Sequence, residues 1–216
     1  MKWVFLGPPG AGKGTQAERL ACHLRVPRLT TGDLLRSAIK EETPLGKKAR
    51  NFVDQGRLVP DEVILGVMAE RMERSDCKKG WLLDGFPRTV KQAEGLDGWL
   101  QERGEKLSGV LLLDVPLSVA VERLTGRRQC EKCGLSFHLA FQPSKKKGVC
   151  DACGGSLVLR SDDAPEAVET RLKVYENQTR PLVAYYQKVR LLQRVDGTQG
   201  PEEVFRTICS LIDGNK

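Results

Sequence analysis

The chain has 216 residues, of which 40% are hydrophobic and 29% are charged, a balance that suits one α/β domain with or without inserts. The sequence has no run near the ~18 apolar residues of a membrane span and no signal-peptide pattern, so we expect a cytoplasmic protein without a membrane partner. The net charge of +7 favours anionic partners. The sequence has no basic stripe with interleaved aromatic residues, which counts against nucleic acid as that partner.

The first predicted element is a buried strand at residues 2–6, and a glycine loop, GPPGAGKGT, follows it at residues 7–15. The loop leads into an apolar pattern of helical spacing. A glycine loop between a strand and a helix turns backbone N–H groups around an anion. Gly12 and Lys13 fit the phosphate-loop pattern G-x-x-x-x-G-K-[ST], but the hydroxyl comes one place late, at Thr15. We predict a nucleotide phosphate site, with Lys13 on the β- and γ-phosphates. The dinucleotide pattern G-x-G-x-x-G is absent here.

Further strands and helices alternate along the chain. The strand-like runs are 80–84, 109–115 and 190–196, and the helical patterns are 61–74, 89–102, 116–125 and 165–188. This alternation predicts right-handed βαβ units and a parallel sheet covered on both faces. Two stretches break the rhythm, and we expect them to be inserts. The predicted core is 1–29, 60–125 and 164–216, and the inserts are 30–59 and 126–163.

An acidic residue, Asp84, ends the apolar strand at 80–84, where phosphate-loop enzymes place a carboxylate associated with Mg²⁺. We expect Asp84 to reach the ion through water; the alternative is a helix cap ahead of GFPR. Asp33 is a weaker candidate, because TTGD also predicts an N-terminal cap for a helix at 34–40.

Four of the seven cysteines form CEKC and CDAC, each followed by glycine. Two C-x-x-C pairs at this spacing predict a closed structural zinc site with Cys130, Cys133, Cys150 and Cys153 as ligands. The insert has almost no apolar core of its own, so metal must supply its fold. A redox pair is the alternative, but it needs only one C-x-x-C. We expect His138 to stay free of the metal and the other thiols, Cys22, Cys77 and Cys209, to be buried and unpaired.

Several separated motifs together resemble one family. They are GPPGAGKGT, TTGDLLR at 30–36, LLDGFPRTVKQAE at 82–94, GRR at 126–128, RSDD at 160–163 and VETRL at 168–172. In this order they are similar to the nucleoside monophosphate kinases, and to the adenylate kinases in particular, over essentially the whole chain. That family's phosphate loop carries glycine after the lysine, as Gly14 does here. The resemblance implies a P-loop three-layer α/β fold with a five-stranded parallel sheet, a helical AMP-binding insert and a zinc-bearing lid.

The resemblance also implies an activity, which is reversible Mg²⁺-dependent phosphoryl transfer between ATP and AMP, giving two ADP, by a monomer that serves adenine nucleotide homeostasis. The residues implied in catalysis are Lys13, Asp84, Arg88, Arg123, Arg127, Arg160 and Arg171. Those implied at ATP are Gly10, Ala11, Gly12, Lys13, Gly14, Thr15, Arg123, Arg127, Ser136 and Phe137. Those implied at AMP are Thr31, Gly32, Arg36, Arg57, Leu58, Val59, Gly85, Phe86, Pro87, Arg88, Gln92, Arg160 and Arg171.

The choice of acceptor base depends on two of these residues, because pyrimidine-nucleotide relatives tend to carry Ala where this chain has Thr31. Thr31 and Gln92 therefore favour AMP. One alternative is a nucleoside monophosphate kinase with another acceptor base. The alternative from a different class is a zinc-ribbon NTPase that binds nucleic acid. Closure of the two inserts would exclude water, with hinges at Gly126 and around Thr30 and Val59.

Overall fold

The structure, a computed structural model, describes residues 1–55 and 57–214. Gly56, within the predicted AMP-binding insert, and residues 215–216, at the end of the predicted core, lie outside the described residues, as does the side chain of Leu45. Within the described part, no helix is both long enough and apolar enough to cross a membrane.

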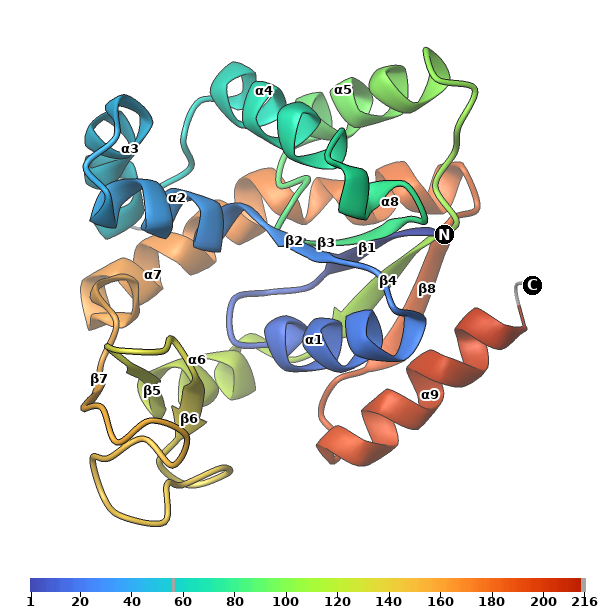
Figure 1. Cartoon of the computed structure of the whole chain (residues 1–216). Coiled ribbons are helices and arrows are strands. Elements are labelled where there is room, and N and C mark those ends of the chain that lie inside the picture. Colours follow the sequence, from blue (N-terminus) through green and yellow to red (C-terminus); the bar gives the residue numbers. More distant parts are fainter. Residues whose placement is uncertain (56, 215–216) are drawn as a thin grey trace.

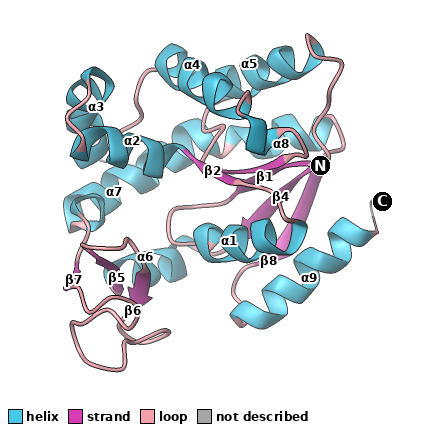
Figure 2. Ribbon diagram, viewed as in Figure 1, coloured by secondary structure: helices cyan, strands magenta, loops and turns pink. Residues whose placement is uncertain are grey.

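The centre of the fold is a parallel sheet, as predicted (Figure 2). Its strands are β1 (Lys2–Leu6), β2 (Arg28–Thr30), β3 (Trp81–Asp84), β4 (Gly109–Asp114) and β8 (Leu192–Asp196), in the order β2-β3-β1-β4-β8. The strand β2 was not predicted, because it has only three residues and takes its place through pairing with β3.

Helices cover both faces of this sheet (Figure 1). One face packs against α1 (Lys13–Leu24) and α9 (Pro201–Asp213), and the other against α4 (Asp61–Met72), α5 (Val90–Gln101) and α8 (Pro181–Lys188). The alternation of β1 explains the two cores, because Trp3 and Phe5 point to the first face and Val4 and Leu6 to the second. The core also contains α6 (Leu117–Thr125), α7 (Pro165–Val174) and the short 3-10 helix η1 (Ser75–Cys77), and a second 3-10 helix, η2 (Ser161–Asp163), ends the second insert.

The helical pattern predicted at 165–188 contains a π turn, η3 (Tyr175–Thr179), between α7 and α8. The amide N–H of Arg180 donates to the carbonyl of Tyr175 at 2.8 Å, five residues back, and Pro181 then starts α8 without an N–H of its own. The π turn therefore lies where proline interrupts the regular helical bonds.

Both predicted inserts contain structure distinct from the sheet. The first holds α2 (Thr31–Lys40) and α3 (Pro44–Asp54), and the second holds a small antiparallel sheet of β5 (Arg127–Cys130), β6 (Ser136–His138) and β7 (Leu157–Val158) in the order β6-β5-β7. Both stand beyond the carboxyl ends of the central strands, whereas β1 begins and α9 ends on the opposite side (Figure 1).

Two local predictions were wrong. The helix expected at 34–40 begins at Thr31, because the hydroxyl of Thr30 caps it by accepting from the Asp33 N–H at 2.9 Å. Cys22 is exposed, because it lies on the outer side of α1, away from buried Ala17 and Ala21. Cys77 is buried, Cys209 is partly buried, and all three thiols are unpaired.

Candidate active site

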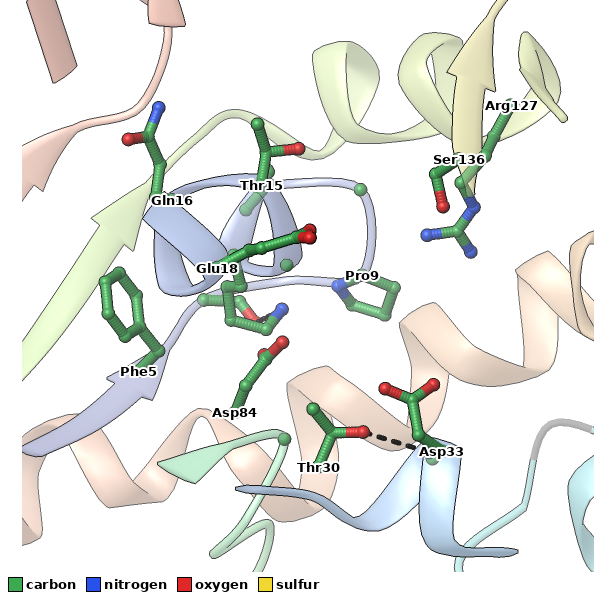
Figure 3. Close-up of a pocket in the computed structure, with 18 of the residues that line it drawn as sticks. Phe5, Pro9, Thr15, Gln16, Glu18, Thr30, Asp33, Asp84, Arg127 and Ser136 are labelled. Carbon is green, nitrogen blue, oxygen red and sulfur yellow. Dashed lines mark hydrogen bonds between the residues drawn. The ribbon is translucent and has the colours of Figure 1, made fainter. Parts of the chain in front are cut away.

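One cleft of about 1230 Å³ lies between the glycine loop, α2 and the lid sheet. Of the residues implied in catalysis or nucleotide binding, the structure brings all but one to this cleft. The exception is Phe86, whose side chain is buried in the hydrophobic core. In Figure 3, Asp84 points from the end of β3 toward the glycine loop, and Arg127 and Ser136 approach from the lid side.

The glycine loop adopts the conformation that its sequence predicts. Gly10 and Gly12 have φ values of 87° and 89°, a region that side chains with a Cβ disfavour. A Cβ on Gly10 would also lie 2.2 Å from the carbonyl oxygen of Ala120. Glycine is therefore required here both for the turn and for the close approach of the loop to α6.

The amine of Lys13 folds back across the loop. Its Nζ donates to the carbonyl oxygens of Gly7 at 2.7 Å and Pro8 at 2.8 Å. The pKa of Lys13 is lowered to about 7, chiefly by burial and also by the positive charges of Arg88 and Arg171, while the charge of Asp84 opposes the shift. An anion in the loop would therefore find a donor group already in place and restore its positive charge.

Buried carboxylates hold three of the predicted arginines. Arg127 donates to both oxygens of Asp163, at 2.6 and 2.5 Å, and Arg171 donates to Asp163 Oδ1 at 2.7 Å. Arg160 donates to both oxygens of Asp162, at 2.8 and 2.5 Å. Burial alone would raise the pKa of Asp162, but the guanidinium groups of Arg171 and Arg160 hold it well below its usual range.

The positive charges in the cleft exceed what these two carboxylates can balance. The pKa of Arg171 is lowered to about 10, and the pKa values of Arg36 and Arg88 are lowered as well, in each case chiefly by loss of hydration and also by neighbouring arginines. Buried cations that disfavour one another's charge are stabilised by an anion placed among them. The arrangement suits a ligand with several phosphate groups.

Asp84 has a partner that the sequence did not predict. Arg28 donates to Asp84 Oδ2 through Nη2 at 2.8 Å and through Nε at 3.3 Å, and its guanidinium lies beside Gly14. The Asp84 side chain is close to fully buried and lines the cleft. Hard oxygen ligands of this kind fit Mg²⁺, which keeps several waters when it binds with a nucleotide.

The predicted adenine contacts lie at the other end of the cleft. The Thr31 hydroxyl donates to the carbonyl of Gly85 at 2.9 Å, and Arg88 Nε donates to the same carbonyl at 2.7 Å. Gln92 is 2% exposed, and its Oε1 accepts from the Arg88 N–H at 2.7 Å. These contacts join the start of α2, the loop after β3 and the start of α5 into one wall.

The lid approaches from the ATP side of the predicted site. Ser136, Phe137, Arg123 and Arg127 line the cleft there, and Arg123 donates to the carbonyl of Gly197 at 2.8 Å. Gly126 ends α6 at a φ of −81°, so it is not needed for its conformational freedom. A Cβ on it would lie 2.4 Å from the His138 ring, which explains the glycine by close packing.

The four predicted cysteine ligands lie together in the lid, with all four sulfur atoms within 4.8 Å of one another. The sulfur atoms of Cys130 and Cys153 are 3.4 Å apart, and those of Cys133 and Cys150 are 3.6 Å apart. Tetrahedral zinc with sulfur at about 2.3 Å requires sulfur separations of about 3.8 Å, so the group fits this ion.

The two cysteine loops have the same backbone hydrogen bonds. Gly134 donates to the Cys130 carbonyl and Gly154 to the Cys150 carbonyl, each at 2.9 Å, and both glycines have positive φ values. The amides of Cys133 and Lys132 lower the pKa of Cys130 to about 6, which favours the thiolate form that binds metal. His138 is not part of the group, and its Nδ1 accepts from the amides of Ala140 and Phe141.

Residues that sequence analysis missed are Arg28, Asp162 and Asp163. The adjacent aspartates were visible in RSDD, but nothing local showed that they pair with the arginines. Arg127 and Asp163 are 36 residues apart, and Arg28 and Asp84 are 56 residues apart. The signal that the sequence offered was two adjacent acids close to Arg160, a predicted anion-binding arginine.

Comparison with known proteins identifies the family. The sequence matches the family described as adenylate kinase over residues 5–191. It is 53% identical to the adenylate kinase of Carboxydothermus hydrogenoformans over 208 residues, covering 96% of this chain and 97% of that protein. It is 50% identical to the adenylate kinase of Clostridium perfringens over 216 residues, with full coverage of both chains. Identity to the adenylate kinase of Thermodesulfovibrio yellowstonii is 51% over 213 residues, with 99% of each chain covered. The chain therefore belongs to the adenylate kinase family, the phosphotransferases that convert ATP and AMP to two ADP.

Proposed function

We propose that the cleft binds ATP between the glycine loop and the lid and AMP between α2 and the loop after β3, so that the two phosphate chains meet among the arginines. The observation that carries this assignment is the group of partly buried cations in one cleft, Lys13, Arg36, Arg88 and Arg171, whose pKa values are all lowered. Such a group is stabilised when the transferring phosphoryl group carries negative charge.

Each residue has a role that follows from its position. Lys13 leaves the loop carbonyls to hold the β- and γ-phosphates, while the backbone N–H groups of residues 10–15 surround them. Arg36 and Arg88 hold the AMP phosphate, whose oxygen is already an anionic nucleophile and needs no general base. Arg127, Arg160 and Arg171 transfer their hydrogen bonds from carboxylates to phosphate oxygens.

Among the carboxylates that line the cleft, Asp84 lies at the end of β3 and points toward the glycine loop, which favours it as the residue near the divalent ion (Figure 3). Asp84 would hold Mg²⁺ through water, and the ion would neutralise charge on the phosphate chain. Arg28 donates to Asp84 Oδ2, which leaves Oδ1 of the same carboxylate to accept from a water that the ion holds. Closure of the lid over ATP excludes the water that would otherwise accept the phosphoryl group.

A coupled assay of ADP formation from ATP with AMP, UMP, CMP or GMP tests the assignment. We expect rapid turnover with AMP alone. Arg88→Lys should lower kcat/KM by about 10²-fold, because an ammonium group cannot replace the paired donors of the guanidinium. Equal turnover with all four acceptors would contradict the adenine assignment, and an unchanged rate in Arg88→Lys would remove that residue from the site.

We also propose that zinc fills the cysteine group and holds the lid together. The lid has a core of only Cys130, Phe137 and Cys150 with two partly buried neighbours, so its packing alone contributes little stability. Cys133→Ser should lower the melting temperature and release zinc measured by elemental analysis, because three thiolates bind zinc less tightly than four. Cys209→Ser, far outside the group, is the matched control. Metal-free protein with an unchanged lid would contradict the proposal.

We propose further that the enzyme works as a cytoplasmic monomer. One cleft within one chain contains both nucleotide sites, so no second subunit is required to complete it. Light scattering coupled to size exclusion should give a mass near the 24.0 kDa of the chain. A stable dimer that remains on dilution would contradict the monomer.

A further inference from the structure

We propose that Asp61, the first residue of α4, fixes the orientation of the Gln92 amide and thereby contributes to selectivity for adenine over guanine in the acceptor nucleotide. Asp61 would be a positioning residue, since it acts on the base through Gln92. The inference rests on the proposed function, in which Gln92 contacts the acceptor base.

The amide of Gln92 has a partner at each end. Its Nε2 donates to Asp61 Oδ1 at 2.7 Å, and its Oε1 accepts from the Arg88 N–H at 2.7 Å. Gln92 is 2% exposed, so these partners replace water. A carboxylate can only accept and a backbone N–H can only donate, so the two partners agree on a single orientation of the amide.

A third residue holds Asp61 in place. The Thr89 hydroxyl donates to Asp61 Oδ2 at 3.1 Å and accepts from the Gln92 N–H at 3.1 Å. Thr89 is the N-cap of α5, and Gln92 lies on the first turn of the same helix. Asp61, Thr89 and Gln92 therefore form a closed ring of hydrogen bonds that links the beginnings of α4 and α5, and the Arg88 N–H joins it at Gln92 Oε1. Rotating the Gln92 amide would break two of these bonds.

This orientation has a consequence for the base. With Nε2 and Oε1 each partly used, Gln92 keeps one N–H and one oxygen lone pair. Adenine presents an acceptor at N1 beside a donor at N6, whereas guanine presents a donor at N1 beside an acceptor at O6. The same amide cannot satisfy both edges without rotating by about 180°. A site that holds the amide fixed leaves buried polar groups unpaired when the wrong base enters, and selectivity follows from that cost.

If Asp61 served only to stabilise the start of α4, its loss would have the same effect as the loss of another acid in that turn. An acidic residue in the first turn of a helix interacts favourably with its macrodipole, and Glu62 occupies the same turn. Glu62 is exposed and pairs with Lys91, 3.3 Å away, with no bond to Gln92. Glu62→Gln is therefore a matched control that removes an acid from the same turn without touching the network.

The experiment measures kcat and KM with AMP and with GMP for Asp61→Ala, Asp61→Asn, Glu62→Gln, Gln92→Ala and the double variant Asp61→Ala/Gln92→Ala. We expect Asp61→Ala to raise KM for AMP by about tenfold, with a smaller change in kcat, and to reduce the ratio of kcat/KM for AMP to that for GMP by about tenfold. Asp61→Asn keeps an acceptor oxygen and should recover most of the selectivity. In the Gln92→Ala background, Asp61→Ala should have no further effect on selectivity.

The outcomes separate the inference from the proposed function. If Gln92→Ala lowers the AMP-to-GMP ratio and Asp61→Ala does not, the inference is overturned while the role of Gln92 stands. If Gln92→Ala leaves the ratio unchanged, the proposed contact between Gln92 and the base is contradicted, and the inference about Asp61 is overturned with it. Equal losses in Asp61→Ala and Glu62→Gln would assign Asp61 to the helix alone. Asp61→Ser, which suits a helix start but is too short to reach Gln92, replaces Asp61→Ala if the latter fails to fold.

Discussion

At the scale of single residues, the site consists of basic side chains that are held by oxygen acceptors of the protein itself. Lys13 binds two carbonyls, and Arg127, Arg160 and Arg171 bind two aspartates. Nucleotide binding therefore exchanges one set of acceptors for another. The long cationic side chains are already ordered before the phosphates bind, so little further conformational entropy is lost, which favours fast and precise alignment.

The first prediction concerns the proton on Lys13. In the free protein its pKa is about 7, well below the ordinary value of 10.5. The amine is therefore mostly neutral at pH 8. Phosphates beside it favour the ammonium form and raise the pKa, so ATP binding at pH 8 should take up a proton. Calorimetry in two buffers of different ionisation enthalpy measures this uptake, which should disappear when titrations are repeated at pH 6.

The variant Lys13→Arg provides the control, because a guanidinium group stays charged throughout this range. At pH 8, where the phosphates of ATP are already deprotonated, binding of ATP to Lys13→Arg should be independent of the buffer. Equal proton uptake in the wild type and in this variant would assign the proton to another group.

The second prediction concerns Asp163, whose side chain has no exposed surface and accepts from both Arg127 and Arg171. Asp163→Asn removes the charge that Arg127 and Arg171 share, and Arg171 keeps only the more distant carboxylate of Asp162, 3.4 Å away. We expect the free energy of unfolding to fall by about 3 kcal/mol, measured by urea denaturation.

The matched control for this prediction is Asp114→Asn. Asp114 also pairs with an arginine, Arg194, but the two side chains are 59% and 54% exposed. The same substitution there should change the free energy of unfolding by less than about 1 kcal/mol. Similar losses at both positions would show that burial does not determine the strength of the Asp163 contacts.

At the scale of elements, the π turn η3 brings a helix to the acceptor site. The Thr179 hydroxyl, at the end of η3, donates to the carbonyl of Arg88 at 2.8 Å. The loop that carries Arg88 is thus held from the α5 side by Gln92 and from the α8 side by Thr179. A regular helix would place residue 179 at a different angle, so the turn has a positioning effect.

The third prediction is that Thr179→Val raises KM for AMP by about fivefold, because it removes one hydrogen bond worth about 1 kcal/mol from the loop. KM for ATP should change much less. Thr179→Ser keeps the hydroxyl and should behave like the wild type. Steady-state kinetics with each substrate varied in turn distinguish these cases, and a parallel rise of both KM values would indicate a general loss of structure.

Elements also show what the sequence could predict. The phosphate loop and the cysteine group are local patterns whose chemistry depends on spacing, and the structure contains both as expected. Four sheet strands followed from their apolar runs. The strand β2, the network around Asp61 and the pairing of Arg28 with Asp84 depend on residues distant in sequence. No local pattern carries that information, because the partners lie far apart in the sequence and meet only in the folded structure.

At the scale of the whole molecule, the two inserts meet at the mouth of the cleft. The Ser161 hydroxyl donates to Asp54 of α3 at 3.1 Å, and Arg36 of α2 lies 3.8 Å from Asp162. The central sheet, by contrast, is buried under two separate layers of helices. The inserts have fewer buried contacts than the sheet, so they are the parts expected to open for substrate entry.

The fourth prediction follows from this difference. A ligand that joins two adenosines through a chain of phosphates should slow amide hydrogen exchange strongly in residues 31–54 and 127–158 and only slightly in β1 and β4. Mass spectrometry of peptides from each region measures the effect, with ATP alone as the control for the lid. Uniform protection over the whole chain would instead indicate global stabilisation without closure.

The placement of the two chain ends has a practical consequence. Because β1 begins and α9 ends on the side away from the inserts, an affinity tag, a dye or a surface tether attached at either end leaves the mouth of the cleft unobstructed (Figure 1). The molecule can therefore be anchored by one end for optical or force measurements while its two inserts are observed through a single turnover.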